Sequence, residues 1–295
     1  MRLLRLLLPI ALIALCLMLT DAGATVARLS GLSAGWVLAT VLILNAVTVL
    51  SGLRWRITAA ALDLQLPLGL AVREYYLAQF ANQTLPGGVL GDASRALRSR
   101  KGGPLRRAAQ AVVLERAAGQ AGMAAVALGG ACAMLMTEGA PTDLPRFIGL
   151  PAGFLALLLL GGAALALRGA TGRGGGWRLA AHKALIRHLP AQAALSLVIA
   201  LMTVAAFAIS ARATGSLLGP VAAAFIVPLV LTAMLLPASI AGWGWREGAA
   251  AALFPLAGLT AEAGVAASIA FGIAVLISAL PGAFFLRRAP SVEPQ

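Results

Sequence analysis

Long runs of apolar residues dominate this chain and predict membrane-spanning helices. A helix needs about 20 mainly apolar residues to cross the hydrocarbon core of a bilayer, and six runs approach this length. They lie near residues 3–20, 34–53, 110–136, 147–167, 189–211 and 263–286. The pattern therefore predicts an all-α polytopic membrane protein with six full transmembrane helices.

Two segments, 57–107 and 217–260, interrupt this pattern because their apolar pieces are too short or too broken for an ordinary crossing. We expect each to be a re-entrant or broken-helix segment that enters and leaves the membrane on one side. The second span is expected to end at Arg54-Trp55-Arg56. With the N-terminus inside, most Lys and Arg residues, including those of the loop from Arg54 to Arg107, then fall on the inner side, as the positive-inside rule requires. The topology predicts a multi-pass membrane protein with both termini cytoplasmic, in which 287–295 form a short tail.

The N-terminus allows two interpretations. Arg2 and Arg5, the apolar run after them and the small residues at 22–24 resemble a signal peptide. The alternative is an uncleaved first span. The topology favours this alternative, because cleavage would leave an odd number of crossings.

The two interrupted segments share one spaced pattern. Its copies are Leu85-Pro86-x4-Gly91-x3-Arg95 and Leu236-Pro237-x4-Gly242-x3-Arg246. The order crossing, crossing, interrupted segment, crossing also recurs, and the two halves begin on opposite sides of the membrane. We therefore expect a single domain, 1–286, built as a 3+3 inverted repeat from 1–136 and 147–286. Such repeats place a transport site at their interface near the midplane.

The first copy has features of an anion site. Pro86 breaks the preceding helix, and Gly87, Gly88 and Gly91 let backbone amides approach a ligand. A helix that opens at Asp92 would direct its N-terminus at this turn, and helix N-termini attract phosphate. Asp92 also suits the position of a simple helix cap.

Arginine side chains can supply the cationic groups of such an anion site. The planar guanidinium of Arg95 or Arg246 suits paired hydrogen bonds to phosphate oxygens. Asn82 adds a polar group just before the first break, and Glu74-Tyr75-Tyr76 are expected at the membrane interface. We expect the two arginines, Asn82 and the three glycines to bind a lipid headgroup, while the remaining basic residues after Arg95 lie on anionic lipid.

The second copy leaves two interpretations open. Its helix-breaking residues are Pro237, Gly242 and Gly244. In one interpretation Arg246 and Glu247 lie within the membrane and need partners there. In the other, Trp243 and Trp245 are interfacial anchors, Arg246 and Glu247 lie at the surface, and the segment makes two short crossings.

Glu115 and Arg116 lie within the third predicted span. Adjacent helical residues do not face each other, so each is expected to pair across helices. Together with Asp92 and Glu247 they form a set that would balance the arginines, with Glu115 opposite Arg95 or Arg246. A buried ion pair without a transport role remains the alternative.

Composition narrows the classes of function. The chain is 60% hydrophobic and 11% charged, and its mean hydropathy is +0.92. The net charge of +13 is explained by positive-inside loops, so we expect no nucleic-acid partner. Cys16, Cys132, His182 and His188 have no ligand spacing, no nucleophile-plus-base set is visible, and we expect neither metal nor cofactor.

Three motifs resemble the lysylphosphatidylglycerol synthase transmembrane family, a flippase-like membrane domain. They are Phe80-x-Asn82-x2-Leu85-Pro86-Gly87-Gly88-x2-Gly91-Asp92-x2-Arg95, Leu114-Glu115-Arg116, and Leu236-Pro237-x-Ser239-x2-Gly242-Trp243-Gly244-x-Arg246-Glu247. Their order and spacing agree over roughly residues 1–286. The chain departs from the family at Leu90, where a further glycine is common, and at Glu115, where Asp is common.

The resemblance implies a translocase of the bacterial inner membrane for an anionic or zwitterionic phospholipid, or for a polyprenyl-phosphate-linked lipid. Two-part members carry a soluble aminoacyl-transferring domain, which this sequence lacks, so we expect no lysyl-lipid synthesis and no enzymatic activity. The alternative is a non-transporting partner of a glycosyltransferase or lipid-modifying enzyme, docked through basic loops at 95–107 and 168–187. A membrane-embedded enzyme acting on lipid phosphates is a third hypothesis, and the oligomeric state stays open.

Overall fold

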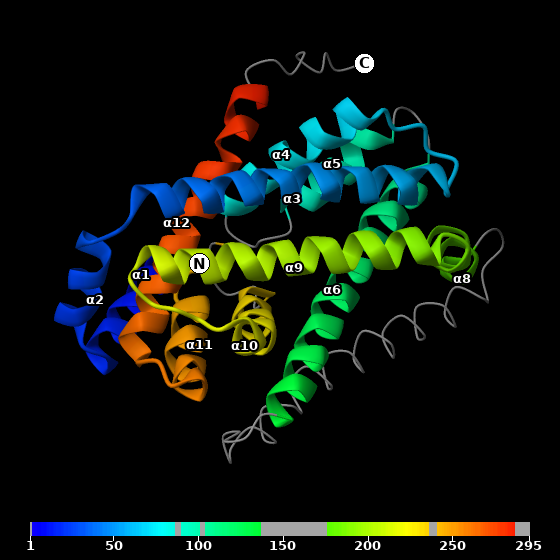
Figure 1. Ribbon diagram of the computed structural model, residues 1–295. Coiled ribbons are helices and arrows are strands. Elements are labelled where there is room, and N and C mark those ends of the chain that lie inside the picture. Colours follow the sequence, from blue (N-terminus) through cyan, green and yellow to red (C-terminus); the bar gives the residue numbers. More distant parts are fainter. Residues whose placement is uncertain (1, 86–89, 101–103, 137–175, 236–240, 287–295) are drawn as a thin grey trace.

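The computed structural model describes the chain except for residues 1, 86–89, 101–103, 137–175, 236–240 and 287–295 (Figure 1). The described residues form helices and no strands, which confirms the all-α prediction. The helices are α1 (Arg2–Leu19), α2 (Ala22–Ser30), α3 (Ala34–Ala60), α4 (Leu68–Thr84), α5 (Leu90–Ser99), α6 (Leu105–Leu135), α8 (Trp177–Ala181), η2 (His182–Ile186), α9 (Leu189–Ala213), α10 (Pro220–Thr232), η3 (Ala233–Leu235), α11 (Trp245–Leu253), η4 (Phe254–Ala257) and α12 (Ala261–Leu286).

Four described helices, α3, α6, α9 and α12, are long and apolar enough to cross a membrane. A fifth crossing is available if α1 and α2 form one broken span, since they meet at a bend of 107°. Asp21 lies at this bend and caps α2, because its carboxylate accepts a hydrogen bond of 2.9 Å from the amide of Ala24. The chain is therefore a multi-pass membrane protein, and the predicted crossing at 147–167 falls outside the described residues.

The second predicted span is longer than the sequence indicated. We expected it to end at Arg54-Trp55-Arg56, but α3 continues to Ala60 and buries both Arg54 and Trp55. The placement of Arg54 in a basic inner loop was wrong. The helix continues because Arg54 has a buried carboxylate partner, which offsets the cost of placing its charge among apolar helices.

Helices α3 and α9 pack side by side in opposite directions (Figure 1). Polar contacts fix this register along the whole interface. They join Ser33 to Ala213 (3.0 Å), Thr40 to Ser210 (3.3 Å), Arg54 to Ser196 (3.2 Å) and Thr58 to Gln192 (2.9 Å). The other long helices, α6 and α12, pack against both members of this pair.

Each interrupted segment consists of two helices flanking a break, namely α4 with α5 and α10 with α11. Helix α4 packs on α12, and α10 packs on α6. Both crossings need glycine: a Cβ at Gly282 would lie 2.3 Å from the carbonyl oxygen of Tyr76, and one at Gly130 would lie 2.5 Å from the amide nitrogen of Phe225. Small residues therefore bring these backbones into direct contact, as is common between membrane helices.

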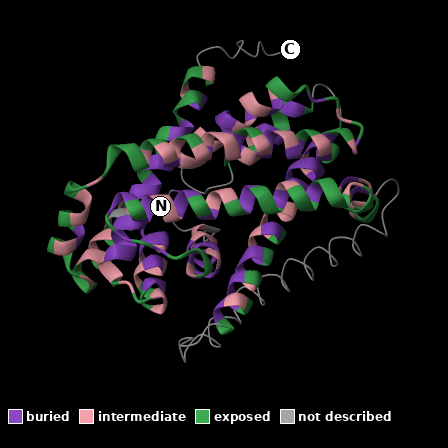
Figure 2. Cartoon of the chain, in the orientation of Figure 1, coloured by how far each residue is buried: buried purple, intermediate pink, exposed green. Residues whose placement is uncertain are grey.

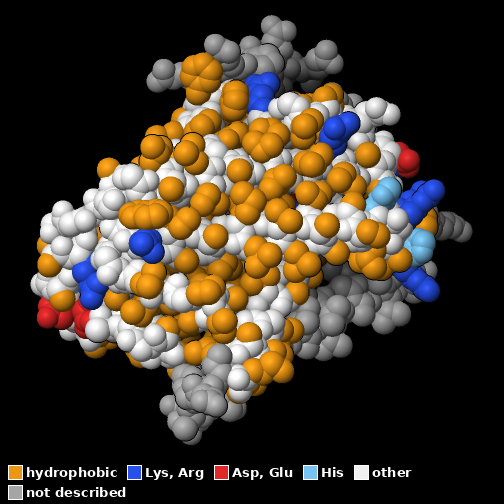
Figure 3. Space-filling view, in the orientation of Figure 1, with side chains coloured by type: hydrophobic (Ala, Val, Ile, Leu, Met, Phe, Trp, Pro, Cys, Tyr) orange, Lys and Arg blue, Asp and Glu red, His pale blue; other side chains and the backbone are white. Residues whose placement is uncertain are grey.

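Buried residues concentrate where these helices cross, and the outer faces of the long helices are exposed (Figure 2). The exposed faces are apolar: Leu38 and Leu42 of α3 and Leu197 and Leu201 of α9 are among the exposed large side chains. Hydrophobic side chains cover most of the face in Figure 3, with few charges. Such a surface is suited to lipid rather than to water.

Candidate functional site

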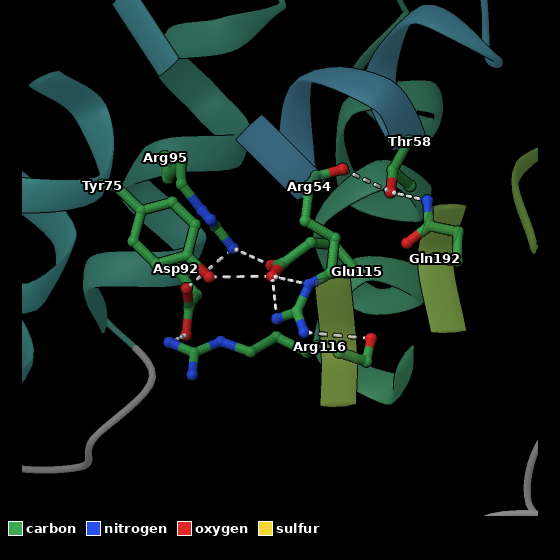
Figure 4. A network of polar contacts seen from close by, with 9 residues as sticks. Arg54, Thr58, Tyr75, Asp92, Arg95, Glu115, Arg116 and Gln192 are labelled. Carbon is green, nitrogen blue, oxygen red and sulfur yellow. Dashed lines mark hydrogen bonds and ion pairs between the residues drawn. The ribbon is translucent and has the colours of Figure 1, made fainter. Parts of the chain in front are cut away.

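A carboxylate at the centre of the first half gathers three partners from three other helices (Figure 4). Glu115 of α6 is fully buried. Its Oε1 atom accepts hydrogen bonds from Arg54 Nη2 of α3 (2.6 Å) and from the hydroxyl of Tyr75 of α4 (2.8 Å). Its Oε2 atom lies 3.1 Å from Nη2 of Arg95 on α5. One carboxylate thus ties α3, α4, α5 and α6 together.

Arg95 contacts two aromatic rings and two carboxylates. Its guanidinium carbon lies 4.4 Å from the ring centroid of Trp55 and 4.4 Å from that of Tyr75. Nη2 contacts both Glu115 and Asp92, the latter at 3.1 Å. Nε and Nη1 are buried without a hydrogen-bond partner among the described residues. Two aromatic faces and two carboxylates hold this cation in one position.

Arg116 completes the network and differs from its neighbours in exposure. Its Nη2 atom lies 2.6 Å from Asp92 Oδ2, while the side chain remains 45% exposed. Three arginines therefore share two carboxylates in the described network, and one positive charge is left in excess. A site with an excess of positive charge favours the binding of an anion.

A cavity of about 400 Å³ lies beside the network, between the two halves of the chain. Arg54, Tyr75 and Arg116 line it together with the amide side chains of Gln79, Asn82, Gln83 and Gln120. Its opposite wall comes mainly from the second half and includes Ile199, Thr203, Leu231, Met234, Gly242 and Phe271. The cavity thus has a charged, amide-rich wall and a largely apolar wall.

A side-chain hydrogen bond and a close backbone approach join α4 to α5. The side-chain carbonyl of Asn82 accepts a hydrogen bond of 2.8 Å from the amide of Gly91. A Cβ at Gly91 would lie 2.1 Å from the carbonyl oxygen of Ala78, so only glycine permits this approach. Asn82 and Gly91 hold the two helices together, and Asn82 also faces the cavity.

The second copy of the motif forms a closed, neutral pair. Nη2 of Arg246 lies 2.7 Å from Oε1 of Glu247, and its Nε atom donates to Ser268 at 2.8 Å. Oε2 of Glu247 accepts a hydrogen bond of 2.6 Å from the amide of Gly244 and so caps α11. Arg246 is 1% exposed. Both charges are therefore buried inside the protein, and the two interpretations of their depth in the membrane stay predictions.

The structure separates the predicted site residues into groups. Pro86, Gly87, Gly88 and Pro237 lie outside the described residues. Asp92, Glu115 and Glu247 each pair with arginine, and Arg116 pairs across helices. Arg95 and Arg246 are buried and do not line the cavity. Headgroup binding by these two arginines stays a prediction, whereas the cavity itself is lined by Arg54 and Arg116.

Sequence reasoning missed Arg54 and Tyr75. Tyr75 was expected at the membrane interface with its neighbours, but its hydroxyl reaches Glu115. A signal for Arg54 was present in the sequence. The residues that share its buried face on an otherwise apolar helix are polar and recur at helical spacing: Thr40, Thr48, Ser51 and Thr58.

No group of three metal-ligating side chains occurs within the described parts of the chain. The arrangement instead provides fixed guanidinium groups beside a cavity in the membrane-spanning region.

Comparison with known proteins identifies the family. Residues 4–282 match the family model described as Lysylphosphatidylglycerol synthase TM region. No curated protein and no solved structure matches the chain. The chain belongs to the lysylphosphatidylglycerol synthase TM region family, which indicates a lipid-related role in the membrane.

Proposed function

We propose that this member of the lysylphosphatidylglycerol synthase TM region family is a lipid translocase of the bacterial inner membrane, with both termini cytoplasmic. Its substrate is a phospholipid or a polyprenyl-phosphate-linked lipid, whose phosphate occupies the cavity between the two halves. The observation that carries this proposal is a cavity of about 400 Å³ lined by Arg54 and Arg116. Ionisable side chains within a membrane protein mark substrate paths because their burial is costly.

The two arginines are prepared to bind phosphate in different ways. Arg54 is fixed by Glu115 and by a hydrogen bond of 3.2 Å to Ser196. Arg116 is held by Asp92 through one nitrogen and remains half-exposed. A phosphate in the cavity would therefore meet one rigid guanidinium and one with free N–H groups. Hydrogen bonds between guanidinium and phosphate are among the strong ones in proteins.

The size of the cavity favours a headgroup over a whole lipid. Ligand pockets commonly measure about 300–1,000 Å³, and 400 Å³ is near the lower end of this range. Acyl chains would remain outside, in contact with the apolar outer faces of α3 and α9. Only the polar part of the lipid then needs a path through the protein.

The packing supports the predicted 3+3 inverted repeat. Helices α3 and α9 are antiparallel counterparts that pack on each other. The crossing of α4 on α12 has its counterpart in α10 on α6, and each uses a glycine of the long helix, Gly282 of α12 or Gly130 of α6. Each broken segment thus packs on the last long helix of the other half. Rocking of such halves about a shared site is how inverted repeats alternate access.

Arg116→Ala tests the proposal with the least damage to the fold, because this arginine is half-exposed. Purified protein is reconstituted in vesicles that contain acyl-labelled fluorescent phosphatidylglycerol, and dithionite quenching measures its movement between leaflets. Loss of a buried charge-assisted contact is expected to slow translocation about tenfold or more. Arg107→Ala is the matched control, since Arg107 is an exposed arginine on the same helix.

Unchanged translocation by correctly folded Arg116→Ala protein would refute the assignment of this cavity. If wild-type protein moves no lipid and copurifies with a glycosyltransferase or a lipid-modifying enzyme, the alternative of a non-transporting partner holds instead. Arg95 would not be part of that docking surface, because it is fully buried.

A further inference from the structure

The charged groups of the cavity are all of one sign. Arg54 and Arg116 are the charged side chains among its described lining residues, and no Asp or Glu is present there. Among these described residues, a ligand group in the cavity therefore meets two positive charges and no negative one.

The carboxylates nearest to the cavity already have arginine partners. Glu115 is fully buried and accepts contacts from Arg54, Arg95 and Tyr75. Asp92 lies between Arg95 at 3.1 Å and Arg116 at 2.6 Å. Neither is left to neutralise an ammonium group, and the network already carries more arginines than carboxylates.

Neutral hydrogen-bonding groups occupy the rest of the polar wall. Gln120 lies one helical turn after Arg116, so both side chains project from the same face of α6. Gln83 of α4 also lines the cavity. Unlike Gln79, which is engaged by Thr48 and Ser278, these two amides have no hydrogen-bond partner within the described part of the chain. Each primary amide offers both donors and an acceptor.

We infer that the cavity selects a phosphate whose substituent carries hydroxyl groups and no ammonium, such as a glycerol or a sugar. This inference rests on the proposed function and specifies its substrate class. The phosphate binds Arg54 and Arg116, and the hydroxyl groups exchange hydrogen bonds with Gln83 and Gln120. An ethanolamine or aminoacyl substituent would place its ammonium beside the two guanidinium groups without a counter-ion. Like charges brought together in a desolvated site discriminate strongly against such a ligand.

Three lipids with identical labelled acyl chains test the inference in reconstituted vesicles. Phosphatidylglycerol carries two hydroxyl groups, phosphatidylethanolamine carries an ammonium, and phosphatidic acid carries no substituent. We expect phosphatidylglycerol to move at least about tenfold faster than phosphatidylethanolamine, because only the second leaves an unpaired cation at the site. Uptake of radiolabelled glycerol 3-phosphate by the same vesicles distinguishes a water-soluble phosphate from a lipid headgroup.

The variant Gln120→Leu tests the hydroxyl contacts separately from the charge. Leucine has a similar volume but no hydrogen-bonding group, so the ratio of phosphatidylglycerol to phosphatidic acid rates should fall about threefold or more. Gln110→Leu is the matched control, because Gln110 lies on the same helix and is buried away from the cavity lining. The control should leave the ratio between the two lipids unchanged.

The outcomes separate this inference from the proposed function. Equal rates for phosphatidylglycerol and phosphatidylethanolamine would overturn the inference and leave lipid translocation standing. No movement of any of the three lipids would overturn the proposed function. Uptake of glycerol 3-phosphate without lipid movement would retain the ligand chemistry and assign it to a solute. An unchanged lipid ratio in Gln120→Leu would remove the amide from headgroup recognition.

Discussion

Replacing Glu115 by Gln removes one negative charge from the centre of the arginine network and keeps the size of the side chain. Glu115 is fully buried and contacts Arg54 at 2.6 Å and Arg95 at 3.1 Å. In the variant, three arginines would share the single carboxylate of Asp92, so the excess charge would rise from one to two. The amide can accept one of the lost contacts but cannot neutralise either guanidinium.

The magnitude follows from burial. Removing one partner of a buried ion pair costs about 3–5 kcal/mol, because the other charge stays desolvated and unpaired. Both arginine partners are buried, Arg54 at 4% exposed and Arg95 at 0%. For a chain of this size, where each kcal/mol lowers the melting temperature by about 2 °C, we expect a decrease of about 6–10 °C.

Thermal unfolding in detergent measures this change, with the surviving folded fraction followed by size-exclusion chromatography. Glu262→Gln is the matched control, since Glu262 is a partly exposed carboxylate at the start of α12 and its loss should cost less than about 0.5 kcal/mol. The double variant Glu115→Gln/Arg95→Gln should regain part of the lost stability by removing the uncompensated cation. If the Glu115→Gln protein has the same melting temperature as the wild type, the charge balance described for this site is refuted.

Two further changes test the packing. Gly91→Ala is expected to destabilise the fold by about 1–3 kcal/mol in the same melting assay, because its methyl group would overlap a carbonyl of α4; Gly129→Ala, with open space at its Cβ, should not. Thr40→Cys/Ser210→Cys, in a background without native cysteines, should form a disulfide under mild oxidation, since the two hydroxyl oxygens lie 3.3 Å apart. Thr40→Cys/Ser196→Cys should not cross-link, and equal cross-linking of both pairs would contradict the antiparallel register.

The long helices were predictable because burial in a bilayer requires long apolar runs, whatever the tertiary contacts. All four long apolar helices therefore begin within about five residues of the predicted limits, and three of them, α6, α9 and α12, also end there. The end of α3 was not predictable in this way. Arg54 looks like a flanking charge in the sequence, and only the partner on α6, distant in sequence, allows it to lie inside the helix bundle.

The site was predictable in its chemistry and less so in its geometry. Glu115 and Arg116 were identified because charges inside an apolar span need partners across helices. Which arginine reaches the cavity depends on side-chain direction and on aromatic packing, which a spacing pattern does not encode. Three separate helices bring Arg95, Trp55 and Tyr75 into contact, and no local signal joins those residues.

The two copies of the motif have the same spacing but different charge balance, and this difference explains why the cavity is charged on one wall. Arg246 is neutralised by its own neighbour Glu247, which also caps α11, so the second copy needs no partner from another helix. In the first copy, the residue after Arg95 is apolar, and the local carboxylate of Asp92 is shared between Arg95 and Arg116. Glu115 of α6 also contacts Arg95, but it is shared with Arg54, so three arginines meet two carboxylates and one positive charge is left beside the cavity. Both copies therefore contain a local carboxylate, and the sharing of carboxylates in the first copy creates the anion site.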